Sequence, residues 1–145
     1  MELFETKIRY EKTMEDGQVK KTSEAYLIDA VSFAEAEARI VEKMTPYIIG
    51  EFTVSAVKRN VVSEVFPGDG DRWYAAKVAY IMIDEKSGME KRSTSNIYVQ
   101  ADNFDKAYKA LLEGMKDTLS DWEIQSLSET AILEIFITDG KKEED

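Results

Sequence analysis

Charged side chains alternate with uncharged, mainly apolar ones near the start of the chain, over residues 4–11. A period of two with one charged face is typical of a half-buried strand. Glu15-Asp16-Gly17 predicts a turn, because aspartate can accept a hydrogen bond from its own backbone and glycine tolerates a positive φ. The apolar residues 25–30 then predict the strand that returns from this turn.

A helical period replaces the alternation in the next segment, which runs from Ser32 to Met44. Ser32, with Glu35 three residues later, predicts a capping box at the start, and Pro46 follows the end. The apolar residues fall on one stripe at spacings of three, four and seven: Phe33, Ala36, Ile40, Val41 and Met44. We therefore expect an amphipathic helix whose stripe packs into the core.

Two apolar runs follow the helix, at residues 52–57 and 61–66, with a polar break between them. They predict either one long strand with a bulge or two strands in succession, and periodicity does not choose between these. We favour a separate fourth strand.

The second half of the chain then repeats the same order of predicted elements. An alternating run at residues 74–82 precedes a turn at 86–88, a helical stripe at 103–115, and apolar runs at 122–127 and 131–137. The second helix begins at Asn103 or Asp102, and it lacks the capping box because Lys106 replaces the glutamate.

This duplication predicts an α+β protein made of two tandem ββαβ(β) repeats, mainly antiparallel, with one helix packed on a sheet face in each repeat. The first repeat spans residues 1–67 and the second spans 72–138, with a linker at 68–71 and a charged tail at 139–145. A single repeat of roughly 65 residues is marginal alone. We therefore expect the two repeats to form one compact unit about a pseudo-twofold axis.

Composition excludes several kinds of chemistry. The chain has 29 acidic and 19 basic residues, a net charge of −10, and neither histidine nor cysteine. Thiol chemistry is excluded, and the commonest general base and zinc ligand are missing. The Gly68-Asp69-Gly70-Asp71 stretch has too few ligands for a calcium loop, and nucleotide-binding and nucleophile motifs are missing. We predict a protein that is not an enzyme and that uses no metal or cofactor.

The sequence gives a simple expectation for location. Residues 1–12 lack the basic region and apolar run of a secretory signal. The most apolar stretch, at residues 74–83, is too short to span a bilayer. We predict a cytoplasmic protein without a membrane partner.

Five residues are candidates for contact with a partner: Lys20, Lys21, Lys91, Arg92 and Trp73. The four cations form two equivalent basic pairs just after the predicted hairpin turns, where they could bind phosphates or acidic protein. Exposed hairpins also carry charge for solubility, and edge lysines prevent strand addition, so this ordinary role is the simpler interpretation. Trp73 falls on the strand face opposite Tyr74, and we expect it to be exposed.

Four stretches carry a resemblance to a known family: LFETKIRYEK at the start, the central RWYAAKVAYIMIDEKSGMEKRS, then VQADNFDKAYKALLEGMKDT, and ETAILEIF near the end. Over nearly its whole length the chain resembles a small family of bacterial and phage-borne proteins of unknown function. The resemblance implies no activity and assigns no site residues. A phage association implies a small accessory or interaction protein.

These observations predict a non-enzymatic binding or assembly module whose partner is a protein, either a different chain or a second copy in a homodimer. The alternative is a nucleic-acid-related role, in which the basic pairs contact phosphates or the acidic surface imitates nucleic acid. The net charge of −10 disfavours direct nucleic-acid binding. The close alternation of glutamate and lysine disfavours a phosphate-like acidic stripe.

Overall fold

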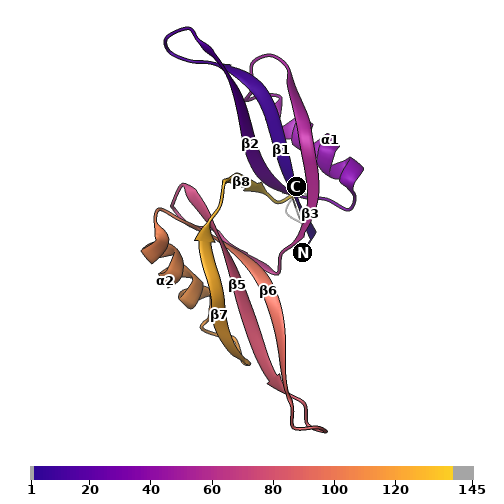
Figure 1. Cartoon of the computed structure of the whole chain (residues 1–145), viewed down its shortest axis with the longest axis vertical. Coiled ribbons are helices and arrows are strands. Elements are labelled where there is room, and N and C mark those ends of the chain that lie inside the picture. The colour runs from indigo at the N-terminus through magenta and orange to yellow at the C-terminus, as the bar shows by residue number, and fades with distance from the viewer. Residues whose placement is uncertain (1, 139–145) are drawn as a thin grey trace, which may run out of the picture. The chain divides into compact units, whose positions relative to one another are not determined.

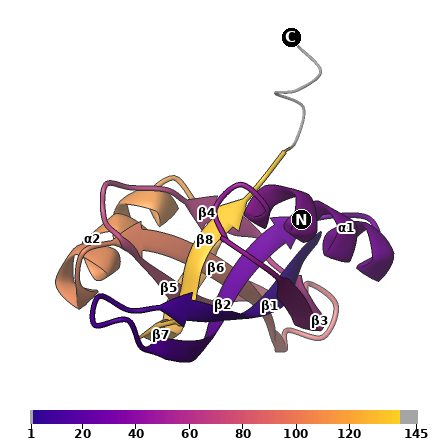
Figure 2. The same cartoon turned by 90° about the horizontal axis from the view of Figure 1, so that it is seen from above.

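A computed structural model of the chain describes residues 2–138 (Figure 1 and Figure 2). The elements follow in the order β1 (Glu2–Thr13), β2 (Val19–Asp29), α1 (Phe33–Met44), β3 (Phe52–Val61), β4 (Glu64–Phe66), β5 (Arg72–Ile83), β6 (Glu90–Ala101), α2 (Phe104–Met115), β7 (Asp121–Glu129) and β8 (Ile132–Phe136). The charged tail predicted at residues 139–145 lies outside the described residues.

The strands form two four-stranded sheets, with the orders β3-β1-β2-β8 and β4-β6-β5-β7. The three long strands of each sheet pair antiparallel, whereas β8 runs parallel to β2 and β4 runs parallel to β6. One helix packs against each sheet. The predicted α+β class is therefore confirmed, and a separate fourth strand follows each third strand.

The two fourth strands are exchanged between the repeats. Strand β4 comes from the first half of the sequence but pairs with β6, and β8 comes from the second half but pairs with β2. The chain divides into two compact units: unit 1 runs up to Val61 and resumes at Ala131, and unit 2 is Val62–Thr130. The compact units therefore differ from the predicted repeats 1–67 and 72–138. The predicted linker 68–71 lies within unit 2, where it joins β4 to β5.

Chain reach explains this exchange. A fourth strand that stayed in its own sheet would have to move from β3 to the outer side of β2. That shift is three strand spacings, or roughly 14 Å. Only Val62 and Ser63 separate β3 from β4, and such a connection spans roughly 10 Å when extended. The short connection therefore cannot place β4 beyond β2.

Local signals explain where the hairpins and helices begin. Gly17 and Gly88 have positive φ values of 85° and 70° in the two hairpin turns, as glycine allows. At α1, Ser32 Oγ accepts from Glu35 N at 3.1 Å, while Glu35 accepts from Val31 N, one residue before the cap. At α2, Asn103 Oδ1 accepts from Lys106 N at 2.9 Å, so Asn103 is the cap.

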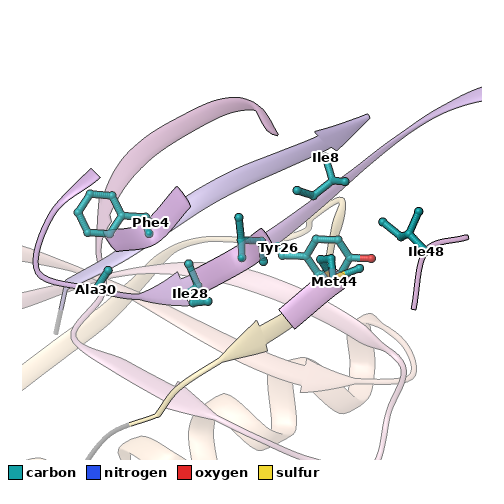
Figure 3. Close-up of a cluster of buried hydrophobic side chains, with 9 residues drawn as sticks. Phe4, Ile8, Tyr26, Ile28, Ala30, Met44 and Ile48 are labelled. Atoms are coloured by element: carbon teal, nitrogen blue, oxygen red, sulfur yellow. The ribbon is translucent and has the colours of Figure 1, made fainter. Parts of the chain in front are cut away.

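The core of unit 1 lies between α1 and one face of its sheet. Its buried cluster consists of Phe4, Ile8, Tyr26, Ile28, Ala30, Ala36, Ile40, Met44 and Ile48. Figure 3 shows side chains of this cluster from β1, β2, α1 and the loop after α1. The helix stripe is narrower than predicted, because Phe33 and Val41 remain partly exposed at its margins.

Unit 2 repeats this arrangement with different side chains. Its buried clusters consist of Ala76, Val78, Ile97, Val99, Leu111 and Met115, and of Tyr74, Ala101 and Ala107. Both third strands also carry a bulge at equivalent places, opposite Lys7/Ile8 and Lys77/Val78. The third element is therefore a bulged strand in each half, in addition to the separate fourth strand.

Candidate binding surface

The two predicted basic pairs lie in different units. Lys20 and Lys21 lie on β2 of unit 1, and Lys91 and Arg92 lie at the equivalent place on β6 of unit 2. Each pair follows a hairpin turn, as the sequence indicates. Their surroundings differ, and this difference identifies one pair as the better candidate.

Both residues of the basic pair of unit 2 form ion pairs with neighbouring carboxylates. Lys91 Nζ lies 3.8 Å from Asp84, and Arg92 Nε lies 3.0 Å from Glu90. Arg92 also donates to Glu123 on β7. The hydrogen bonds to Glu123 and then Glu90 raise the pKa of the Arg92 guanidinium. Little of this positive charge is left for a partner.

Among the described residues, the basic pair of unit 1 lacks ion pairs of this kind, although Glu11 lies opposite Lys21 in the β1–β2 ladder. Within residues 2–138, Lys20 and Lys21 form no ion pair, and neither do Arg9 and Lys12 on the facing strand. Lys12 lies directly opposite Lys20 in the β1–β2 ladder. Like charges in this position repel each other and destabilise a hairpin. Sequence reasoning missed Lys12, although pairing the strands outward from the turn at Gly17 would have found it.

The nearest acidic side chain on β2 is engaged elsewhere. Glu24 accepts hydrogen bonds from the hydroxyls of Tyr10 and Tyr26, at 3.0 and 2.9 Å. Burial, and then the bond and charge of Glu24, raise the pKa of the Tyr26 hydroxyl. Glu24 is thus held by tyrosines, and it leaves the lysines of the hairpin unpaired.

Open concavities flank this part of the hairpin. One, of about 500 Å³, is lined by Arg9, Tyr10, Glu11, Lys21, Thr22 and Ser23. Another, of about 350 Å³, is lined by Lys12, Met14, Lys20, Lys21, Thr22 and Ser23. Because side chains alternate along a strand, the two sets of charged residues lie mainly on opposite faces of the hairpin.

Exposed apolar residues adjoin these cations. Tyr47 and Ile49, in the loop between α1 and β3, are 77 % and 97 % exposed. They line a concavity of about 310 Å³ together with Tyr10, Glu11, Lys12, Thr13 and Ile48. We use the name hairpin-end surface for six residues that surround this end of unit 1 on both faces of the hairpin: Arg9, Lys12, Lys20, Lys21, Tyr47 and Ile49. In Figure 1 the turn between β1 and β2 extends past α1 at this end of unit 1.

Trp73 does not contribute to a surface. Its side chain is only 3 % exposed, although we expected exposure from its position opposite Tyr74. Both residues are buried, so the alternation of buried and exposed positions does not hold at the start of β5. Its Nε1 has no hydrogen-bond partner in the described structure. Its carbonyl accepts from the backbone and side chain of Thr130.

Two kinds of site are missing from the part of the chain that the structure describes. No group of three or more Asp, Glu, His or Cys residues is placed to hold a metal ion there. Over the same residues, no helix has the length and apolar character needed to cross a membrane.

Comparison with known proteins identifies the family. No curated protein and no solved structure matches the chain. A family model described as a domain of unknown function (DUF4494) matches residues 2–138. The match spans both repeats, as did the resemblance in the sequence, and the chain therefore belongs to this family.

Proposed function

We propose that this protein is a non-enzymatic module that binds another protein through the hairpin-end surface of unit 1. The observation that carries the proposal is the proximity of the exposed Tyr47 and Ile49 to the unpaired Lys12. Exposed aromatic and apolar anchors next to charge are typical of protein interfaces. We place the protein in the cytoplasm, as an accessory protein of a bacterium or a phage.

A nucleic-acid role has weaker support. Lys20 and Lys21 could contact phosphates, but Lys91 and Arg92 are already paired with carboxylates. Two matched basic surfaces are therefore not available. The net charge of −10 also opposes the approach of a polyanion.

The test is an affinity pull-down of the tagged full-length chain from native lysate, with and without nuclease, read by mass spectrometry and nucleic-acid staining. Ile49→Ser removes an exposed apolar anchor without touching the core. Leu119→Ser is the matched control, because Leu119 is equally exposed in the corresponding loop of unit 2.

Retention of a defined protein after nuclease treatment, lost with Ile49→Ser and kept with Leu119→Ser, supports the proposal. Recovery of nucleic acid that disappears when Lys20 and Lys21 are changed to alanine would favour the alternative instead. A protein partner that tolerates Ile49→Ser and Tyr47→Ser would move the interface away from this surface.

A further inference from the structure

Strand β2 is only partly covered on its outer side. Strand β8 pairs with it at Ala25–Ile28, near its end. Residues 19–24 have β1 on one side and, among the described residues, no strand on the other. A strand edge of this kind presents free backbone donors and acceptors in line with β8.

The turn fixes which backbone groups lie at this edge. Met14 N donates to Gln18 O, which makes these two residues a hydrogen-bonded pair across the turn. Hydrogen-bonded and non-bonded pairs alternate along an antiparallel ladder. The N–H and C=O groups of Val19, Lys21 and Ser23 therefore point away from β1.

Unit 2 supports this assignment. Asp84 N donates to Met89 O across its turn, so the same alternation turns the backbone of Thr94 and Asn96 away from β5. Asn96 O indeed accepts from Ser63 N, at 2.9 Å, beside the start of β4. Thr94 corresponds to Ser23 in the repeat and provides a matched position.

Charge indicates what this edge would bind. Lys20 and Lys21 project to opposite faces of the strand, and both lack ion pairs among residues 2–138. Lys20 faces Lys12 across the ladder, whereas Lys21 faces Glu11, so Lys20 is the stronger candidate for a carboxylate. A carboxylate placed beside Lys20 would offset its repulsion by Lys12. The concavities near this strand are lined by residues of both β1 and β2, so they lie over the faces of the hairpin onto which Lys20 and Lys21 project.

Other occupants fit less well. Two copies of this edge paired antiparallel would bring the lysines of one copy against those of the other. The outer strand β3 is a poorer template, because the bulge at Ser55 interrupts its ladder and bulges protect sheet edges.

We infer that residues 19–24 of β2 bind an acidic segment of a partner protein in extended conformation, as an added strand in line with β8. This inference rests on the proposed function and adds the chemistry of the partner. Main-chain hydrogen bonds to Val19, Lys21 and Ser23 would supply affinity, and the lysines would select carboxylates.

The probe is a fluorescently labelled peptide that alternates glutamate and valine, compared with one in which lysine replaces each glutamate. Ser23→Pro removes an outward N–H without removing a bond to β1, and its ring obstructs the edge. Thr94→Pro makes the same change in unit 2 and is the matched control. Binding is followed by fluorescence anisotropy, and the amides of Lys21 and Ser23 by NMR.

We expect the acidic peptide to bind, and Ser23→Pro to weaken binding by about tenfold or more. Thr94→Pro should leave binding unchanged, and the lysine peptide should not bind. Lys20→Ala with Lys21→Ala should weaken binding and flatten its salt dependence. Absence of binding, equal binding of both peptides, or equal losses from the two proline variants would overturn the inference.

The pull-down separates this inference from the proposed function. A protein partner lost with Ile49→Ser but retained with Ser23→Pro would leave the module intact and remove only the strand-addition site. A protein that dimerises in light scattering, with the dimer broken by Ser23→Pro, would assign the edge to a second copy and contradict the acidic peptide.

Discussion

The end of the fourth strand is held differently in the two units. In unit 1, Thr138 N donates to both carboxylate oxygens of Asp29, at 3.0 and 3.2 Å. Arg39 forms an ion pair with the same carboxylate at 2.9 Å, and it also donates to the Asp29 carbonyl and the Thr138 hydroxyl. In unit 2, Gly68 N donates to Gln100 Oε1 at 3.1 Å, and Ala110 stands where the repeat would place Arg39.

The aromatic residue of the fourth strand also has different neighbours in the two units. Phe136 of β8 stacks on Tyr26, with ring centroids 5.8 Å apart, and Lys43 Nζ lies 5.6 Å from its centroid. Phe66 of β4 instead lies over Gly114, the position equivalent to Lys43, so closely that a Cβ there would come within 2.5 Å of the ring. Charged side chains therefore stabilise the fourth strand in unit 1. In unit 2 the fourth strand is stabilised by close packing that leaves room only for glycine.

The largest expected effect comes from breaking the close packing of unit 2. In Gly70→Ala the new Cβ would lie 2.0 Å from the carbonyl carbon of Ala101, and backbone cannot move aside as a side chain can. We expect a loss of about 3 kcal/mol or more in the free energy of unfolding.

Tryptophan fluorescence during denaturant unfolding measures this loss, because Trp73 and Trp122 both lie in unit 2. Amide exchange in β8 serves as the control for unit 1. An unchanged denaturation midpoint for Gly70→Ala would contradict this difference between the units. So would amide exchange that becomes as much faster in β8 as in β4.

The next effect comes from removing the charge in unit 1. Arg39→Ala deletes the ion pair with Asp29 and the bonds to the strand end, in a setting that is only partly exposed. We expect a loss of about 1–3 kcal/mol, seen as faster amide exchange in β8 with β4 unaffected. Lys106→Ala, which removes an exposed helix pair with Asp102, is the control and should change stability by less than about 0.5 kcal/mol. Equal exchange changes in β4 and β8 would show that Arg39 does not act locally.

The elements of this fold could be predicted from the sequence because their signals are local. Alternation marks β1 and β5, the stripe and Ser32 mark α1, and Asn103 marks the start of α2. The exchange of β4 and β8 could not be predicted in this way, since it depends on strand order. Once the order β3-β1-β2 is known, the short connection at Val62 and Ser63 makes it necessary.

The sequence predicts where the two basic pairs lie, but it does not predict which of them forms ion pairs. Both basic pairs lie beside hairpin turns, as expected, but their ionic state depends on distant residues such as Glu123, on β7. The burial of Trp73 also has no local signal, because alternation says nothing of a strand covered on both faces. Pairing across a turn and burial of a second face are both properties of tertiary structure.

A smaller loss in the free energy of unfolding should appear at alkaline pH, and it should arise only from unit 1. The pKa of Tyr26 is raised above its ordinary value of 10.0 by burial and then by Glu24, so folding favours the protonated hydroxyl. The stability from this group is fully present below pH 10.0, its unfolded value, and is lost as the pH rises towards the higher folded pKa. Unit 2 has Ile97 at this position and should not share the effect.

The unfolding free energies of the wild type and Tyr26→Phe, compared across this pH range, measure the effect. The advantage of the wild type over the variant should shrink as the pH rises beyond 10.0. Tyr47→Phe, at an exposed position, is the control. A constant difference between wild type and Tyr26→Phe would show that folding does not favour the protonated hydroxyl.

The smallest effect concerns the like charges of the unit 1 hairpin. Met82 occupies the place of Lys12 in unit 2 and lies opposite Lys91, so Lys12→Met gives unit 1 the pairing of unit 2. Removing the repulsion from Lys20 should stabilise the protein by roughly 0.2–1 kcal/mol, and the gain should shrink at high salt. Lys7→Met, opposite Ala25 and Ala56, is the control without a facing cation.

The same substitution should act on binding with the opposite sign. If the edge of β2 takes an acidic strand, Lys12 repels Lys20 in the free protein and attracts the carboxylates in the complex. Lys12→Met should then raise the denaturation midpoint and lower the affinity for the acidic peptide by several-fold. Both changes should be smaller at high salt. If Lys12→Met gains stability but keeps its affinity for the acidic peptide, the peptide does not relieve the repulsion between Lys12 and Lys20. Lys12 would then have no role in binding the peptide.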